Sequence, residues 1–400
     1  MNKLTALFIN AVAGMLPVGK KSTSTKKKIL IVRLDGIGDY ILFIEFLRGL
    51  RDLYPDNDFE LTLVGNLLWK DLGEKNPFVD HTVFISRERF RKEAAYRFRA
   101  LRDIARRSFD IAINPTISRE ALMGDSIMQA SSAAVRIGSI GYGGNISQMG
   151  KRISDRWYTE LLPLADDAPM ELDQQAYFLN KLGLGSHLIR PPRLQIEPEW
   201  QKDADRLLEK TGYPPPYVLL SPGVGLPKGK AWPLERFADL SARINAELGV
   251  TVLLCGGPGE GILAKKILSS STGNRIVDLT GETGLGTMAA LIAVSEALVA
   301  GDTGVVHMAS AIGIPSVCVL GGGHMGRFLP YRIGNRLLEK GSSNDGYGTT
   351  PPLVVTSVRS CKCDNWNCTR DEWLGGSFPC IDEVDTDQVF DALKRVMANG

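Results

Sequence analysis

Residues 27–40 read Lys-Lys-Ile-Leu-Ile-Val-Arg-Leu-Asp-Gly-Ile-Gly-Asp-Tyr, and this stretch decides the predicted fold. The apolar run 29–34 has the length and β-branching of a buried parallel strand. A glycine turn follows, and apolar residues at helical spacing then predict a helix over 39–54. In an open α/β sheet, ligands bind at the carboxyl ends of the strands. Asp39 is expected at that position, with Asp35 nearby.

The length and composition favour a globular protein of two domains. The chain has 400 residues, of which 44% are hydrophobic and 23% charged, and its net charge is +2. A chain of this length is too long for one common core. No apolar run reaches the roughly 20 residues that cross a bilayer.

The first 28 residues are basic: they contain six lysines and no acidic residue. The apolar stretch 4–16 is interpreted as a short amphipathic helix in the membrane interface, followed by lysines that face anionic headgroups. We therefore expect an anionic membrane surface to bind residues 1–28. A disordered or packing extension is one alternative. A signal peptide cleaved near Ala11-Val12-Ala13 is another.

Strand-like and helix-like segments alternate in two series, 27–186 and 199–345. This alternation predicts an α/β protein with two doubly wound, Rossmann-like domains that face each other across a cleft. The basic extension 1–26 precedes them, and a proline-containing linker, 187–198, joins them. Residues 346–400 form a cysteine-containing tail that ends in a helix.

Three polar turns follow predicted strands of the second series. The first, 221–233, offers flexible backbone and cations that suit an anionic group, through Gly223, Gly225, Lys228, Lys230 and Trp232. The second, 255–261, carries Glu260 at a helix start, where an acid can hold ribose hydroxyls. The third, 301–307, would cap a helix whose N-terminus attracts anions, and contains Asp302, Thr303, Gly304 and His307.

Each of these turns also has a purely structural interpretation. Asp302 or Thr303 alone is equally well explained as a helix cap, and His307 alone is better explained as a packing histidine. Trp232 with its following proline would then only fix the loop. The three turns in this order are far more specific than any one of them.

Taken together, three blocks resemble glycosyltransferase family 9, the group that includes the ADP-heptose:lipopolysaccharide heptosyltransferases. The blocks are Arg-Leu-Asp-Gly-Ile-Gly-Asp at 33–39, Lys-Ala-Trp-Pro at 230–233 and Gly-Asp-Thr-Gly-Val-Val-His at 301–307. The resemblance runs from about Lys27 to Tyr331. It implies a GT-B fold and an inverting sugar transfer from a nucleotide-diphospho-sugar, without a metal. ADP-heptose as donor and a lipid-linked or lipopolysaccharide glycan as acceptor are implied by the resemblance alone.

The resemblance also implies roles for individual residues. Asp39 matches the general base, and Lys230 matches the lysine on the donor diphosphate. Glu260 would hold the ribose, and the turn Asp302–Gly304 would lie against the phosphates. Gly223, Val224 and Gly225 depart from members that carry hydroxyl residues there, which puts a hydroxyl contact to phosphate in doubt.

The chemistry fits these residues on general grounds. A carboxylate can take the proton of an attacking hydroxyl, and this is typically worth about 10²–10⁴-fold in rate. Lys230 and the helix N-terminus at 303 can stabilise the departing diphosphate. By itself, Asp39 is better explained as an N-cap of the following helix; together with the other blocks, the general base is preferred. We expect Asp39 and Lys230 to be catalytic.

The helical segment 87–107 has eight arginines and one lysine against three acids. It is either a solvated basic face or a contact for a phosphorylated or membrane-bound acceptor. Arg119, Arg136 and Gly38 are expected to line the acceptor side. A nucleic-acid partner is not expected, because the aromatic interleaving of single-strand binders is missing.

The tail contains Cys361, Cys363, Cys368 and Cys380. Four clustered thiols in a chain expected to be cytoplasmic favour a structural zinc site over disulfides, although the usual paired spacing is missing. Free packing thiols are the equal alternative. No cofactor is expected to be required for catalysis.

We expect an enzyme at the inner face of the cytoplasmic membrane, peripheral to it. One alternative is a nucleotide-sugar epimerase or a dinucleotide-binding oxidoreductase on similar sheets. A complete Gly-x-Gly-x-x-Gly, which the oxidoreductase would carry, is missing from the turn at 36–39. A non-catalytic glycan-assembly protein on the same fold is a third possibility, against which the presence of Asp39 and Lys230 argues.

Overall fold

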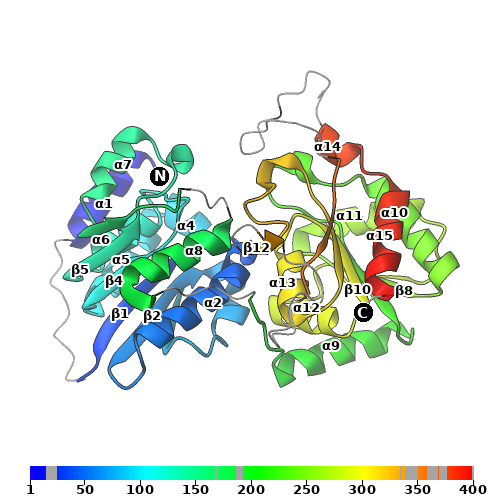
Figure 1. Cartoon of the computed structure of the whole chain (residues 1–400), viewed down its shortest axis with the longest axis horizontal. Helices are drawn as coiled ribbons and strands as arrows, with labels where there is room; N and C mark the ends of the chain where they lie inside the picture. The colour runs from blue at the N-terminus through cyan, green and yellow to red at the C-terminus, as the bar shows by residue number, and fades with distance from the viewer. Residues whose placement is uncertain are drawn as a thin grey trace. The chain divides into compact units, whose positions relative to one another are not determined.

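The computed structural model describes residues 1–14, 25–166, 170–185, 192–333, 336–337, 350–357, 368 and 376–398. The chain forms two compact units (Figure 1). Unit 1 consists of Met1–Gly36, Phe43–Ala168 and Asp173–Ile189. Unit 2 consists of Ile37–Leu42, Pro169–Leu172 and Arg190–Gly400.

Unit 1 is built on a parallel sheet of six strands in the order β3-β2-β1-β4-β5-β6. The strands are β1 (Lys27–Arg33), β2 (Phe59–Asn66), β3 (His81–Ile85), β4 (Ile111–Asn114), β5 (Val135–Ser139) and β6 (Glu160–Leu162). The side chains of 29–32 are at most 1% exposed, as a strand covered on both faces requires. The strand order reverses between β1 and β4, which makes their carboxyl ends the expected ligand position.

Helices cover both faces of this sheet (Figure 1). They are α1 (Lys3–Gly14), α2 (Ile37–Leu53), α3 (Lys70–Gly73), α4 (Arg87–Lys92), α5 (Ala94–Arg106), α6 (Gly124–Ala130), α7 (Gln148–Asp155) and α8 (Glu171–Leu179). The basic segment expected as one helix over 87–107 is two helices, because Glu93 takes an extended backbone conformation with φ −105° and ψ 111°. Helices α2 and α8 meet through the rings of Phe46 and Phe178, 5.9 Å apart.

The N-terminal helix α1 packs on unit 1, where it contacts α5 and α6. Ala6, Ile9 and Asn10 are buried, whereas Phe8 on the other side is 70% exposed. This part of the chain therefore matches the packing extension that the sequence left as an alternative. The last lysines of the basic segment, Lys27 and Lys28, belong to β1. Among the described residues, no helix combines the length and apolar character needed to cross a membrane.

Unit 2 repeats the same topology, with a parallel sheet in the order β14-β11-β10-β7-β8-β9. Its strands are β7 (Tyr217–Ser221), β8 (Thr251–Leu254), β9 (Ile276–Asp278), β10 (Ala297–Gly301), β11 (Ser316–Val319) and β14 (Leu353–Val355). The order reverses between β7 and β10. A short antiparallel pair, β12 (Arg332–Ile333) and β13 (Arg336–Leu337), lies outside the sheet. The two doubly wound, Rossmann-like sheets predicted from the alternation are confirmed.

The helices of unit 2 also lie on both faces of its sheet (Figure 1). They are α9 (Pro198–Thr211), α10 (Leu234–Arg243), α11 (Gly261–Ser270), α12 (Leu285–Ala293), α13 (Gly304–Ile312), α14 (Pro379–Asp382) and α15 (Thr386–Ala398). Phe390 and Leu393 of α15 belong to the same buried cluster as Val218 of β7 and Val299 of β10. The C-terminal segment therefore completes the core of unit 2 and adds its edge strand β14.

Two of the four tail cysteines lie in the described part of the chain. Cys380 is buried in the core of unit 2, and Cys368 packs against that core. Cys361 and Cys363 lie outside the described residues. Within the residues described, no group of three or more histidine, cysteine or acidic side chains is placed to hold a metal ion. The zinc site stays a prediction.

Candidate active site

The reversal of strand order in unit 2 brings two of the predicted turns together. The turn after β7 carries Lys230, which is only 8% exposed. Its Nζ donates a hydrogen bond of 2.9 Å to the backbone carbonyl of Asp302, in the turn after β10. The same Nζ lies 3.9 Å from the Asp302 carboxylate. A buried ammonium needs such partners, because losing its hydration shell is costly.

The Asp302 carboxylate is buried and has a second partner, His324, at 2.8 Å from Nδ1. An ionised carboxylate only accepts hydrogen bonds, so Nδ1 of His324 carries the proton. Burial by itself would raise the pKa of Asp302. The hydrogen bond from His324 and the charge of Lys230 outweigh burial and hold that pKa below its ordinary value. The carboxylate is therefore an anion at neutral pH and orients both neighbours.

Helix α13 begins immediately after this carboxylate and has an uncapped N-terminus. Thr303 occupies the N-cap position, but its side chain makes no capping hydrogen bond. Its hydroxyl instead donates to the carbonyl of Gly301 at 3.4 Å. The first N–H groups of a helix lack partners within the helix, and the helix dipole adds partial positive charge there. This is the geometry in which proteins hold phosphate groups.

The turn that opens α2 packs on the start of α13, and Ile37–Leu42 accordingly belong to unit 2. A Cβ on Gly38 would lie 2.8 Å from Cδ2 of His307, and a Cβ on Gly304 would lie 2.7 Å from Cβ of Ile37. Both glycines are needed for this close approach. Asp39 follows Gly38 in the first turn of α2 and is partly exposed. The sequence had assigned this turn to the first domain, whereas its packing assigns it to the second.

His307 is buried beneath this turn, with 3% of its surface exposed. Its Nδ1 is hydrogen-bonded to the hydroxyl of Tyr331 at 2.6 Å, and the two rings stack. Burial lowers the pKa of His307 to about 4. The imidazole is therefore neutral at physiological pH and adds no charge beside Lys230.

The predicted ribose carboxylate, Glu260, lies between two glycines of different turns. Its Oε2 accepts the N–H of Gly257 at 2.9 Å. A Cβ on Gly223 would lie 2.0 Å from Oε1, and a Cβ on Gly256 would lie 2.4 Å from Oε2. Gly223 thus serves the site by leaving room for Glu260. The carboxylate stands at the carboxyl ends of β7 and β8.

Three other residues expected to bind the donor lie differently. Gly225 and Lys228 are exposed, and Nζ of Lys228 donates to the carbonyl of Val224 at 3.5 Å. Trp232 is 1% exposed, and its indole N–H donates to the carbonyl of Val384 at 2.8 Å. Its ring also packs edge-on against Phe237. Trp232 is a core side chain that fixes the loop, as the structural interpretation of the sequence allowed.

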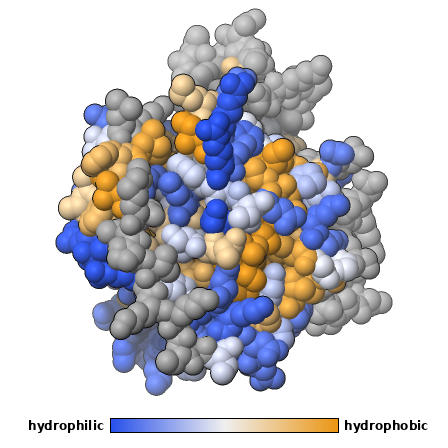
Figure 2. Space-filling model, turned by 90° about the vertical axis from the view of Figure 1, so that its left-hand side faces the viewer, coloured by the Kyte–Doolittle hydropathy of each residue, from blue (hydrophilic) through white to orange (hydrophobic). Residues whose placement is uncertain are grey.

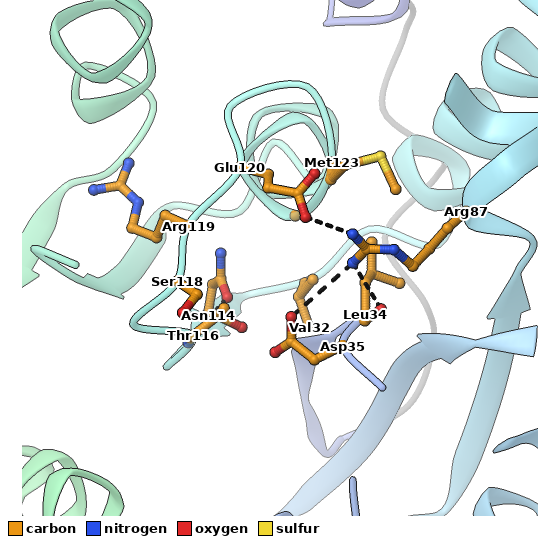
Figure 3. A pocket seen from close by; sticks show the side chains of 11 residues that line it. Val32, Leu34, Asp35, Arg87, Asn114, Thr116, Ser118, Arg119, Glu120 and Met123 are labelled. Atoms are coloured by element: carbon orange, nitrogen blue, oxygen red, sulfur yellow. Dashed lines mark hydrogen bonds and ion pairs between the residues drawn. The ribbon is translucent and has the colours of Figure 1, made fainter. Parts of the chain in front are cut away.

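Unit 1 has a small pocket where its own strand order reverses, at the carboxyl ends of β1 and β4 (Figure 3). Arg87 donates to the carbonyl of Leu34 at 2.9 Å and forms an ion pair with Glu120. Its guanidinium is 4.0 Å from the carboxylate of Asp35. Figure 3 shows this guanidinium between the two acids. The pocket therefore presents polar groups of both signs.

Arg119 and Arg136, expected on the acceptor side, have structural partners. Arg119 is 1% exposed and bridges Asp125 at 2.9 Å and Asp155 at 2.7 Å. Its side chain points away from Arg87 in Figure 3. Arg136 lies near the amino end of β5 and donates to the carbonyls of Trp157 and Ala133. These contacts engage both guanidinium groups, and Arg119 also lines the pocket of Figure 3, so a place on the acceptor side stays a prediction for both residues.

Several residues of these two sites escaped the sequence analysis. His324 and Tyr331 complete the cluster around Asp302 and His307, and Arg87 and Glu120 form the pocket of unit 1. His324 follows β11 in a glycine-rich turn, which is the signal that identified the other three turns of unit 2. Arg87 is one of eight arginines in the segment 87–107, and its position in the sequence does not set it apart from the others. Only the tertiary fold distinguishes it from its solvated neighbours.

Comparison with known proteins gives an independent result. The family model for glycosyltransferase family 9 (heptosyltransferase) matches residues 98–342. Lipopolysaccharide heptosyltransferase 2 of Escherichia coli is 28% identical over 162 residues, which cover 36% of this chain and 46% of that protein. The matched part thus spans less than half of this relative.

Two solved structures share the fold. One is a family 9 glycosyl transferase from Veillonella parvula, with a TM-score of 0.75 and 19% identity over 95% of this chain and 100% of that one. The other is the ADP-heptose lipopolysaccharide heptosyltransferase II of E. coli, with a TM-score of 0.68 and 17% identity over 93% and 99%. They confirm the predicted GT-B type of two-domain α/β fold. Since the family model covers more than half of the chain, this protein belongs to glycosyltransferase family 9 (heptosyltransferase).

Proposed function

We propose that this glycosyltransferase moves heptose or a similar sugar from a nucleotide-diphospho-sugar to a lipopolysaccharide or other cell-surface glycan, with inversion at the anomeric carbon. The observation that carries the proposal is the arrangement in unit 2. Lys230, Asp302 and the uncapped start of α13 adjoin one another, and the turn bearing Asp39 packs on that helix. A cation and a helix N-terminus suit the donor diphosphate, and an adjacent carboxylate suits the base.

In the proposed reaction, the acceptor hydroxyl attacks the anomeric carbon opposite the leaving group. A bond forms between the acceptor oxygen and that carbon while the bond to the diphosphate oxygen breaks. Asp39 takes the hydroxyl proton, and the electron pair of the broken bond leaves with the nucleoside diphosphate. Lys230 and the N–H groups of α13 stabilise the charge that gathers on the diphosphate. Glu260 holds the ribose of the donor. No step requires a metal ion.

The acceptor side of the proposal rests on unit 1. Arg87, placed between two carboxylates in the pocket of Figure 3, offers a cation to phosphate or carboxylate groups of the acceptor. A guanidinium matches such groups in geometry as well as charge. ADP-heptose as donor and a lipid-linked glycan as acceptor follow the names of the relatives. We place the protein in the cytoplasm, at the inner face of the cytoplasmic membrane.

The test is the substitution Asp39→Asn, which preserves shape and removes the proton acceptor. We expect transfer to fall by about 10²–10⁴-fold, while the affinity for the nucleoside diphosphate is retained. Asp52→Asn, at the exposed end of the same helix, is the matched control and should keep full activity. Unchanged turnover in Asp39→Asn would refute the base. Absence of transfer in the wild type with all nucleotide sugars would refute the proposed function.

A further inference from the structure

Helix α7 presents apolar and basic side chains on one exposed face. Met149, Arg152 and Ile153 of α7 and Arg156, the C-cap residue of this helix, have the i, i+3, i+4 and i+7 spacing of a single helix face. Met149 is 72% and Ile153 36% exposed, and both arginines are exposed. The opposite face is anchored, since the hydroxyl of Ser154 accepts a hydrogen bond from the buried Arg119. The exposed face therefore has a fixed orientation.

A groove of about 570 Å³ lies beside this face, between α7 and the start of α1. Most of the side chains that line it are apolar, and they include Met1, Leu7, Leu122, Met149, Ile153 and Trp157. Helices α1 and α7 lie at the left of Figure 1, and Figure 2 looks onto that side, where hydrophobic and hydrophilic residues are interspersed. The volume is that of a site for a small ligand or a lipid chain.

The charges around the groove are mainly positive. Arg91 lines the groove and is 62% exposed, although it also contacts Glu120. Asp155 is already paired with Arg119 and Lys151. Arg152 and Arg156 form no ion pair with any residue that the structure describes. Two exposed arginines thus flank an apolar groove, and no acid in the described part of the chain neutralises them.

We propose that this groove and the exposed face of α7 bind an anionic membrane lipid. One acyl chain lies in the groove, and the headgroup phosphate lies against Arg152 and Arg156. The inference rests on the proposed function, which places the protein at a membrane. It assigns the membrane contact to α7, whereas the sequence analysis expected it in the lysine-rich residues 1–28. An apolar face interspersed with arginines suits a lipid–water interface, where chains and phosphates are adjacent. A protein partner would favour fewer charges at the centre of the patch.

The test is sedimentation of the full chain with vesicles. We expect the wild type to bind vesicles of phosphatidylcholine with phosphatidylglycerol, and to bind pure phosphatidylcholine at least tenfold more weakly. Met149→Ser/Ile153→Ser and Arg152→Gln/Arg156→Gln should each weaken binding to the anionic vesicles about tenfold or more. Leu68→Ser and Lys265→Gln/Lys266→Gln, at other exposed positions, should bind as the wild type does.

A second measurement locates the lipid chain. Trp157 lines the groove, so vesicles with brominated acyl chains should quench tryptophan fluorescence more than unbrominated ones. Trp157→Phe should bind the same vesicles but lose most of that difference. The inference would be overturned if both double variants bound anionic vesicles as tightly as the wild type does. It would also be overturned if the extra quenching by brominated chains persisted in Trp157→Phe. Neither vesicle binding nor fluorescence quenching measures sugar transfer. Failure of the proposed function is therefore distinguished from failure of this inference, because it appears as absence of transfer in a separate assay.

Discussion

Lys230 shows how one buried side chain joins two turns that are far apart in the sequence. Its ammonium donates to the backbone of Asp302 and lies 3.9 Å from that residue's carboxylate. The family motif indicated a phosphate contact for this lysine. The structure adds a second task, which is to neutralise a buried acid. Removing Lys230 should therefore affect both ligand binding and folding stability.

We predict that Lys230→Ala weakens binding of a nucleoside diphosphate by about tenfold or more, because a hydrogen bond to a charged group contributes about 1.5–3 kcal/mol. The melting temperature should fall as well, since the buried Asp302 carboxylate loses the ammonium beside it. Titration calorimetry measures the first effect and thermal unfolding the second. Lys265→Ala, on the exposed side of α11, is the matched control. Normal affinity in Lys230→Ala would contradict the phosphate role.

His307 gives the site a defined pH dependence. Its pKa is about 4 in the folded chain, because the ring is buried, and about 6.5 in an unfolded chain. Between these values the unfolded state binds the extra proton, so the free energy of unfolding falls as pH drops from about 6.5 to 4. The loss approaches about 3 kcal/mol for the complete interval.

His307→Gln should make stability less dependent on pH in that range, because the variant cannot take up the proton. Urea unfolding of both proteins at pH 7.5 and 5 measures the difference. Asp302 does not interfere, since its lowered pKa makes its own contribution fall only in more acidic solution. Equal slopes for wild type and variant would show that His307 does not titrate in this way.

At the scale of elements, the packing of α1 on unit 1 depends on a buried cation, Arg97. Arg97 of α5 is fully buried, and within the described structure its hydrogen bonds go to neutral acceptors only. Asn10 of α1 is one of them, accepting from Nε at 3.0 Å and from Nη2 at 2.8 Å. Burial lowers the pKa of Arg97 to about 10, so it is still charged at neutral pH.

Asn10→Ala should therefore destabilise the protein by about 2–3 kcal/mol, because two hydrogen bonds to a buried guanidinium disappear. Phe8→Ala is the matched control on the same helix. Its side chain is 70% exposed, so the free energy of unfolding should change by less than about 0.5 kcal/mol. Chemical denaturation measures both. Equal stabilities of the two variants would mean that α1 contributes little to the fold of unit 1.

Features set by adjacent residues could be predicted from the sequence, whereas contacts between distant residues could not. Local patterns predicted the two sheets and the turns around Lys230, Glu260 and Asp302, because strand, glycine turn and helix start are adjacent in the sequence. The pairing of Arg119 with Asp155 joins residues 36 positions apart, and no local pattern marks it. Trp232 was ambiguous for the same reason, since Val384, which accepts its N–H, lies 152 residues away.

At the scale of the whole molecule, the two sheets have the same strand order but carry different groups where that order reverses. Unit 2 places a buried lysine, a helix N-terminus and Glu260 there. Unit 1 places Arg87 between Asp35 and Glu120. The turn Ile37–Leu42 is part of unit 2 by its packing, although it directly follows β1 of unit 1. The proposed base thus belongs to the unit that holds the proposed donor site.

This assignment predicts which amides respond to a nucleoside diphosphate in hydrogen exchange. Peptides covering 221–233, 301–312 and 37–42 should exchange more slowly, because the last of these packs on α13 through Gly38. At a ligand concentration of 100 times the dissociation constant, the stabilisation is about 2.7 kcal/mol, so exchange by unfolding of unit 2 slows by up to about 100-fold. Peptides of α7 in unit 1 serve as the internal control and should not change. Protection of 301–312 without protection of 37–42 would separate Asp39 from the donor site and remove the structural support for its role as the base.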